Sequence, residues 1–510
     1  MTPKWGYTVM DKDDLVWEKL EDDLEKWELS VNKAVIYRGV AALILKYRPG
    51  EAVELHMPIK GGYNAFYRLE YKDGSSAGMR IPCKVPRREI RYEVATMKYV
   101  AANTTIPVPK IYGWGTAEEN PTGLGPFMII EYIEHSRTLS DALKDPTLGP
   151  KEEPVLDPNI DEQKLSFLYG QMANILLQLS TLTFPQISSL DQDSNGNISV
   201  SGHPITMNMN NLIEHTNIPP SILPIHPHNY ASTTAWYSAL ADMHLTQLTF
   251  QHNDAIADDD DARDKYIARQ LFRRLAHEGR LSPPPPSTDA TDPSSEFRLF
   301  SEDLRPSNVL VDADDRIVSV IDWEFAYVAP AQYSRDPPWW LLLKMGDYWP
   351  GGHEAFVEAY GVRLETFLRV LEVEEGKMRE ADEAKKREGG ETKTDDEDVV
   401  NGIASLSLST TPLSQQMCQS YTSNTWLTNL ATRDSWTFDF LFWRYLDEQF
   451  FGDEKENEEQ DYHARLDLLT EREREAMEEF VLAKVRDSEE RVVVEWGEEE
   501  AKARLAEVMV

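Results

Sequence analysis

Cysteine is scarce in this chain of 510 residues, which holds only Cys83 and Cys418. Two cysteines cannot build the disulfide framework of a small secreted domain, and they form no zinc-type cluster. Long apolar runs are also missing: the longest early run, residues 39–45, is far shorter than the roughly 20 residues that cross a bilayer. Residues 1–14 lack the apolar core of a signal peptide. We therefore expect a cytoplasmic protein without a membrane partner.

Positively charged residues are also fewer than negatively charged ones. Lysine and arginine together number 52 against 88 aspartates and glutamates, which gives a formal net charge of −36. A surface of this sign repels nucleic acids and anionic lipids, so the sequence predicts no nucleic-acid partner. It is compatible with a cationic small molecule, and no pattern in the chain indicates a particular protein partner.

Three polar residues stand at the ends of two short apolar segments late in the chain. Val309–Val311 and Val318–Ile321 are typical of the two arms of a β-hairpin. Asp303 precedes the first arm, Asn308 stands at its entrance, and Asp322 follows the second arm. The hairpin therefore predicts that the three side chains lie close together.

The spacing of these residues suits phosphoryl transfer. Asn308 follows Asp303 by five residues, and Asp322 follows Asp303 by nineteen. Kinases use an aspartate to orient the attacking hydroxyl and accept its proton, and an asparagine with a second aspartate to hold magnesium. An acidic turn beside a buried hairpin, with no catalytic role, is the alternative. The order of the three residues, with Pro306 between the first two, favours a site.

The segment resembles the catalytic loop of the aminoglycoside phosphotransferase and choline kinase branch of the protein-kinase-like fold. In that branch an Asp-Trp or Asp-Phe pair replaces the Asp-Phe-Gly of protein kinases, and here Asp322 precedes Trp323. The likeness to fungal members continues to Pro338-Trp339-Trp340 and covers roughly residues 50–350. It implies an α+β, two-lobe fold with an antiparallel sheet and one helix in the small N-lobe and a mainly helical C-lobe.

Hydrophobic periodicity and composition divide the chain into five parts. These are a helical extension at 1–50, the small lobe at 51–134, the large lobe at 135–374, a disordered acidic and Ser/Thr-rich insert at 375–415, and a helical end of the large lobe at 416–510. Four consecutive prolines predict an exposed linker at 282–295 within the large lobe.

The resemblance also implies roles for single residues. Asp303 would be the catalytic base, and Asn308 and Asp322 would hold Mg²⁺ beside ATP. The nucleotide site would be formed by the loop residues Gly61, Gly62 and Asn64, the phosphate clamp Arg80, its ion-pair partner Glu93, and the hinge residues Glu131 and Ile133.

These assignments predict transfer of the γ-phosphate of ATP to a hydroxyl of a small molecule. The resemblance implies an amino-alcohol or aminoglycoside-like acceptor, whose amine Glu324 or Asp336 is a candidate to bind. Two departures leave alternatives open: Arg80 stands where kinases keep a lysine, and Ser301 stands where they keep a histidine. A nucleotide-binding pseudokinase that acts as an interaction module is the second reading. A protein kinase is the third, because the apolar segment after Asp322 lacks an Ala-Pro-Glu ending.

Overall fold

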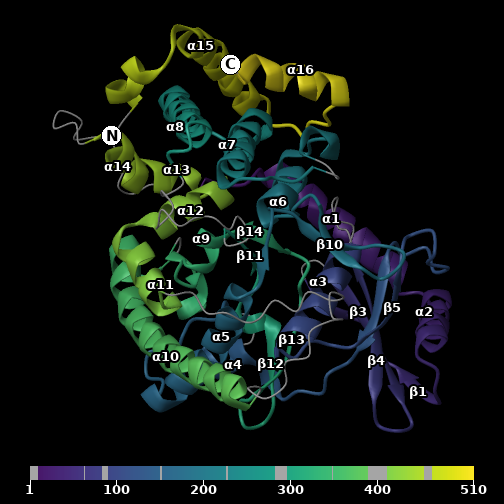
Figure 1. The fold of residues 1–510 in the computed structure, drawn as a ribbon. Coiled ribbons are helices and arrows are strands. Elements are labelled where there is room, and N and C mark those ends of the chain that lie inside the picture. Colours follow the sequence, from purple (N-terminus) through teal and green to yellow (C-terminus); the bar gives the residue numbers. More distant parts are fainter. Residues whose placement is uncertain are drawn as a thin grey trace.

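The computed structural model describes residues 10–61, 64–82, 90–149, 152–224, 228–281, 296–346, 349–388, 411–452 and 462–509. The molecule consists of two lobes (Figure 1). Two helices precede the small lobe in the sequence. The predicted linker at 282–295 lies outside the described residues. The architecture agrees with the predicted α+β, kinase-like fold.

The small lobe is a six-stranded antiparallel sheet with one helix. Its elements are β1 (Ala52–Leu55), β2 (Ile59–Lys60), β3 (Asn64–Tyr71), β4 (Ser76–Pro82), α3 (Ile90–Asn103), β5 (Ile111–Gly115) and β6 (Phe127–Glu131). The strands run in the order β1-β3-β4-β6-β5, and β2 pairs with β3. An antiparallel sheet with one helix is what the resemblance implied for this lobe.

Burial in this sheet follows strand periodicity. Alternate residues of β3 are buried, and they pack with α2 (Ala34–Tyr47) in one apolar cluster. Strand β4 is buried along six of its seven residues. The helices α2 and α3 lie on opposite sides of the sheet (Figure 1), which explains why the central strand is buried on both faces.

The N-terminal helices connect the two lobes. Residues 11–46 were expected to be helical, and the chain forms α1 (Asp14–Val31) and α2 with a break at Asn32. The start of α1 is fixed to the large lobe, where buried Asp13 accepts hydrogen bonds from the backbone and side chain of Asn253 at 2.9–3.0 Å. Its end meets the small lobe, where the Tyr67 hydroxyl donates to the Val31 carbonyl at 3.3 Å. Helix α1 therefore spans both lobes.

The large lobe surrounds a central helix, α5 (Glu162–Ser180). Its periodicity predicts one apolar face, which is buried at Leu165, Leu168, Tyr169, Met172 and Leu179 and only partly buried at Leu176. The other helices of this lobe are α4 (Leu139–Leu143), α6 (Met207–Thr216), α7 (Thr233–Phe250), α8 (Asp259–His277), α9 (Ala331–Ser334), α10 (Gly352–Glu388), α11 (Leu413–Thr422), α12 (Thr425–Arg433), α13 (Phe438–Leu441), α14 (Asp447–Phe451), α15 (Glu471–Glu490) and α16 (Glu498–Val508). The last two cap the end of the lobe farthest from the sheet (Figure 1).

Three small antiparallel sheets hold the loops of the large lobe. Strand β11 (Phe297–Ser301) lies between β14 (Ala326–Pro330) and β8 (Thr183–Phe184). Strand β12 (Val309–Val311) lies between β13 (Ile317–Val320) and β7 (Arg137–Thr138). The third sheet is the hairpin of β9 (Ser189–Gln192) and β10 (Ile198–Gly202). The pairing of β12 with β13 is the hairpin that the sequence predicted.

The prediction of disorder over 375–415 is wrong where the structure describes this segment. Residues 375–388 continue α10, and α11 begins at Leu413, whereas 389–410 lie outside the described residues. The charge-dense stretch is rich in Glu, Lys, Arg and Ala, which are strong helix formers. Glu375 is 1 % exposed and accepts hydrogen bonds from the backbone and hydroxyl of Ser414 at 3.0 and 2.7 Å. Its charge therefore joins two helices instead of keeping the segment solvated.

The attachment of α1 gives a test of stability. Replacing Asp13 with Ala removes the cap that accepts from Val16 N at 3.0 Å and leaves the Asn253 amide without its carboxylate. We expect Asp13→Ala to lower the free energy of unfolding by about 2–4 kcal/mol, as measured by urea denaturation. Asp22→Ala, at an exposed site on the same helix, should change it by less than about 0.5 kcal/mol. Equal effects of the two substitutions would contradict the anchoring role.

Candidate active site

The catalytic-loop residues meet as their spacing predicted. Asp303 and Asn308 are both buried, at 5 % and 8 % exposure. The Asn308 amide donates to the Asp303 carbonyl at 2.8 Å and to its carboxylate at 2.9 Å. Pro306 opens the short 3₁₀ turn that ends at Asn308, where its fixed φ suits the first position. The turn therefore folds the asparagine back onto the aspartate.

The β12–β13 hairpin brings Asp322 to the same place. Val309 pairs with Val320, and Ile321 N donates to the Asn308 carbonyl at 2.9 Å, so Asp322 begins beside Asn308. Asp322 has a φ of +65°, in the left-handed region that a non-glycine residue seldom adopts. Trp323, which is 1 % exposed, fixes the following turn by donating from its indole to the Val320 carbonyl at 3.1 Å. The strained backbone aims the carboxylate away from the hairpin.

Arg80 joins the two lobes at this point. Its guanidinium pairs with Glu93 of α3 and with Asp322, and it lies 3.5 Å from the Glu324 carboxylate. Asn64 at the start of β3 donates to the other oxygen of Glu324 at 3.3 Å. One buried cation from β4 therefore meets carboxylates from the small lobe and from the end of the catalytic hairpin.

The charge balance of this cluster holds Arg80 ionised. Burial works against the charged guanidinium, but the nearby carboxylates of Glu93, Asp322 and Glu324 outweigh it and raise the pKa of Arg80. One cation facing three carboxylates leaves surplus negative charge. The cluster is therefore an environment that favours a further cation.

The carboxyl group of Asp303 has a raised pKa. Burial raises its pKa to about 6, with the negative charge of Asp322 acting in the same direction. Arg305, Asn308 and Arg80 oppose this shift, and Arg305 Nε lies 2.8 Å from the Asp303 carboxylate. Asp303 is thus ionised at neutral pH but close to its point of protonation.

The loop has a brace in place of the missing histidine. Ser301 takes that position and pairs with Ala326 of β14. The next residue, Glu302, accepts from the Tyr327 hydroxyl at 2.8 Å and from Met207 N at 2.7 Å, and loss of solvent raises its pKa. Through its carboxylate, Glu302, which directly precedes Asp303, is hydrogen-bonded to β14 and α6.

The structure places only some of the predicted nucleotide-site residues of the small lobe beside the catalytic loop. Arg80, Glu93 and Asn64 come together with the catalytic loop, as described above. Gly61 donates its N–H to the Asn64 carbonyl at 2.8 Å in the β2–β3 turn, whereas Gly62 lies outside the described residues. Glu131 N already donates to the Lys110 carbonyl at 2.8 Å, so its N–H is engaged within the small lobe. The role of Ile133 stays a prediction.

Two residues near the reaction centre differ from what the sequence suggested. Arg305 was not singled out, although an arginine two residues after Asp303 was a usable signal. Glu324 was a candidate partner for a substrate amine, and it contacts Arg80 instead.

Asp336 was a candidate to bind an acceptor amine, with capping of a turn as the alternative, and the structure gives it partners within the chain. Its carboxylate is 9 % exposed and accepts from Ser420 and Asn429 at 2.9 Å each. Arg433 lies 3.6 Å from its other oxygen. These contacts fasten the segment after β14 to α11 and α12, so the carboxylate has a structural role.

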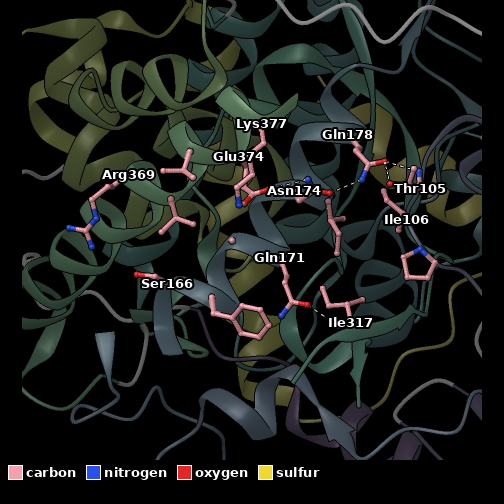
Figure 2. Close-up of a pocket in the computed structure, with 16 residues that line it drawn as sticks. Thr105, Ile106, Ser166, Gln171, Asn174, Gln178, Ile317, Arg369, Glu374 and Lys377 are labelled. Carbon is pink, nitrogen blue, oxygen red and sulfur yellow. Dashed lines mark hydrogen bonds and ion pairs between the residues drawn. The ribbon is translucent and has the colours of Figure 1, made fainter. Parts of the chain in front are cut away.

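A separate cavity of about 630 Å³ lies on the side of α5 that faces α10. Figure 2 shows Gln178 meeting Thr105 and Glu374 lying between Asn174 and Lys377, whereas Arg369 and Ser166 lie apart from them. Neither Asp303 nor Arg80 lines it. Its polar groups fasten the loop after α3 to the large lobe.

The donor set suits a hard cation, although the described residues contain no group of three His, Cys, Asp or Glu side chains that could hold a metal ion. Asp322 and Asn308 offer a carboxylate and an amide, and oxygen donors of this kind are those that Mg²⁺ prefers, with phosphates and water completing its shell. Two protein ligands are therefore compatible with magnesium that arrives with a nucleotide.

Comparison with known proteins decides the family. The sequence model of the phosphotransferase enzyme family matches residues 56–371. The chain belongs to this family. The match includes Arg80, Glu93 and the whole catalytic loop, and it ends within α10. Helices α1 and α2 and the helices from α11 onward are therefore outside the region shared with the phosphotransferases.

Individual relatives are distant. A subtelomeric hrmA-associated cluster protein of Aspergillus fumigatus is 28 % identical over 134 residues, which are 26 % of this chain and 23 % of that protein. The altered inheritance of mitochondria protein 9 of Clavispora lusitaniae, named as mitochondrial, is 24 % identical over 300 residues, or 53 % of this chain and 47 % of its own length. The chain thus matches less than half the length of either relative. Its cytoplasmic location stays a prediction.

Similar solved structures include an ethanolamine kinase of Plasmodium vivax, with a TM-score of 0.40, 12 % identity and coverage of 86 % of this chain and 88 % of that one. Another is a thermostable mutant of an aminoglycoside phosphotransferase in a ternary complex with AMP-PNP and hygromycin B, with a TM-score of 0.36, 14 % identity and coverage of 66 % and 88 %. At these values the likeness says nothing about the ligands of this chain. In the part that the structure describes, no helix is both long and apolar enough to cross a membrane.

The raised pKa of Asp303 predicts a pH-dependent change of stability. The folded-state pKa of about 6 lies above the ordinary 3.8, so ionised Asp303 lowers the free energy of unfolding above pH 6, and this effect fades as the pH falls toward 4. We expect Asp303→Asn to raise the free energy of unfolding by about 1–3 kcal/mol at pH 8 and by clearly less at pH 4.5, measured by urea denaturation. Asp314→Asn, on the exposed β12–β13 turn, is the control. A gain that does not vary with pH would contradict the prediction.

Proposed function

We propose that the chain is an ATP- and magnesium-dependent phosphotransferase that transfers the γ-phosphate of ATP to a hydroxyl group of a small molecule. The observation that carries this proposal is the meeting of Asp303, Asn308 and Asp322 beside Arg80. In-line phosphoryl transfer needs positioned groups and charge neutralisation more than covalent chemistry by the protein. Membership of the phosphotransferase enzyme family supports the same reaction class.

Asp303 is the proposed base. General-base catalysis is most effective when the pKa of the base lies near the working pH, and burial raises the pKa of Asp303 to about 6. The carboxylate would orient the acceptor hydroxyl and take its proton as the new O–P bond forms and the bond from the γ-phosphorus to the leaving ADP breaks. Asn308 holds the carboxylate in place by its amide hydrogen bond.

Asp322 and the amide oxygen of Asn308 are the proposed ligands of Mg²⁺. The bound ion would supply charge neutralisation between the nucleotide phosphates. Arg80, held by Glu93, would bind phosphate as a permanent cation, and the turn at Gly61, with Gly62 and Asn64, would cover the phosphates. The carbonyl of Glu131 and the backbone of Ile133 would meet the adenine.

A nucleotide-binding pseudokinase is the second candidate. The ion pair of Arg80 with Asp322 favours it, because the guanidinium occupies a carboxylate that a magnesium ion would need. An active enzyme has to release this contact when the nucleotide and its metal bind. A pseudokinase can keep it.

For the active enzyme, the acceptor is a small molecule rather than a protein. The segment from β14 to α9 is short and largely buried, and it offers no exposed activation loop. The family resemblance suggests an amino-alcohol or aminoglycoside-like acceptor, and the net charge of −36 is compatible with a cationic one.

Magnesium-dependent nucleotide binding tests the proposed metal ligand. Isothermal titration calorimetry with ATP, with and without Mg²⁺, should show binding by the unchanged chain that strengthens with the metal. Asp322→Asn should lose most of the magnesium-dependent part, about tenfold or more in Kd, because the carboxylate is replaced by a weaker ligand. Asp314→Asn should bind as the unchanged chain does. A folded protein that binds no ATP in either condition would exclude the phosphotransferase proposal.

Replacement of the base separates catalysis from binding. Asp303→Asn should lower kcat for phosphate transfer about 10²- to 10⁴-fold while the Kd for magnesium-ATP changes little. The assay is transfer of radiolabelled γ-phosphate to a panel of amino alcohols and amino sugars. Transfer by the unchanged chain that survives in Asp303→Asn would show that another group is the base. Nucleotide binding without transfer to any acceptor would favour the pseudokinase.

A further inference from the structure

Helix α3 carries Glu93, and contacts with the large lobe hold this helix. Tyr92, next to Glu93, is 4 % exposed and forms one apolar cluster with Ile205 and Phe325. Phe325 follows the segment that contains Asp322 and Glu324. The residue beside Glu93 therefore packs where the catalytic hairpin ends.

Gly202, at the end of β10, allows the ring of Tyr92 to approach. A Cβ atom on Gly202 would lie 2.4 Å from Tyr92 Cζ and 2.6 Å from its hydroxyl oxygen. Real side chains do not come so close, so any larger residue at 202 has to displace the ring or the strand. The contact sets how near α3 lies to the β9–β10 hairpin.

The hairpin itself is fixed to the catalytic sheet. Ser188, just before β9, exchanges backbone hydrogen bonds with Val328 of β14 at 2.8 and 3.2 Å, and its hydroxyl donates to the Gly202 carbonyl at 2.5 Å. Strand β14 pairs in turn with β11, which leads to Asp303. A continuous set of backbone contacts thus connects Gly202 to the catalytic loop.

Polar contacts extend along α3. Lys98 donates to the Gln192 side chain at 2.6 Å, and Arg91 lies 3.4 Å from the Asp191 carboxylate, both on β9. Just beyond the helix, the backbone N–H and hydroxyl of Thr105 donate to Gln178 of α5 at 2.8 and 3.1 Å (Figure 2). The large lobe therefore holds the helix at both ends.

We propose that Tyr92 and Gly202 are positioning residues that place α3 so that Glu93 holds Arg80 against Asp322 and Glu324. The inference rests on the proposed function, since it assigns to this contact the arrangement of the phosphate-binding cation. The β9–β10 hairpin acts as a clamp on α3, because the contact of Gly202 with Tyr92 fixes the position of the helix. The ion pair of Arg80 with Glu93 is then set by packing within the chain and requires no separate activation event.

Gly202→Ala tests the clamp with two independent measurements. Hydrogen exchange followed by mass spectrometry should show faster exchange in residues 90–103, because the added methyl group displaces Tyr92. Calorimetry should show magnesium-ATP binding weakened by roughly tenfold, since small displacements of a positioning group have large effects. Ser199→Ala, at an exposed site on the same strand, should change neither quantity.

A double variant separates positioning from general damage. Tyr92→Leu removes the ring that the methyl group strikes, so Gly202→Ala should have little additional effect on exchange or ATP affinity in the Tyr92→Leu background. This non-additivity is expected only if the two residues act through their mutual contact. Additive losses, or faster exchange with unchanged ATP affinity in Gly202→Ala, would overturn the positioning role.

The two measurements also distinguish this inference from the proposed function. If the unchanged chain binds no ATP while exchange in α3 responds to Gly202→Ala and not to Ser199→Ala, the phosphotransferase proposal falls and the clamp stands. If the unchanged chain binds ATP and Gly202→Ala alters neither exchange nor affinity, the clamp falls and the phosphotransferase proposal stands.

Discussion

The buried guanidinium of Arg80 is the interaction on which the two lobes depend. Glu93 comes from α3, and Asp322 and Glu324 come from the end of the catalytic hairpin, so one cation joins three carboxylates from separate parts of the chain. Removing one partner from a buried ion pair leaves an uncompensated charge and is strongly destabilising. The surplus of negative charge leaves room for a further cation, which is a suitable environment for a metal ion that arrives with phosphate. The cluster stabilises the resting protein, and its contact between Arg80 and Asp322 has to open for a nucleotide and its metal to bind.

Other contacts between the lobes support this arrangement. Helix α1 is fixed to the large lobe at Asp13 and meets the small lobe at Val31, and α3 is held by the β9–β10 hairpin. In two-lobe kinases, relative motion of the lobes opens and closes the nucleotide site. Here α1, which lies outside the residues that the family model matches, is attached to both lobes and is a restraint on their relative position. The restraint is consistent with an ion-pair cluster that is already assembled.

The catalytic loop shows how a missing residue can be replaced by different chemistry. Ser301 stands where kinases keep a bracing histidine, and its absence suggested a loosely held loop. The carboxylate of Glu302 instead accepts hydrogen bonds from Tyr327 and Met207. This brace comes from tertiary contacts with β14 and α6, and neither partner lies near Glu302 in the sequence. A substitution in a motif is therefore weak evidence for inactivity until its surroundings are seen.

The sequence by itself determined the local features of the site. Asp303, Asn308 and Asp322 are connected by a 3₁₀ turn and a hairpin. These are short-range structures with recognisable residue preferences, so the order and spacing of the three residues predicted that they meet. Tertiary structure alone decided the partners of Arg80, which lies 242 residues from Asp322 along the chain. It also decided that Glu375 is buried, because its contact with Ser414 bridges 39 residues of the chain. Local propensity acts over a few residues, whereas burial and ion pairing depend on which distant segments the fold brings together.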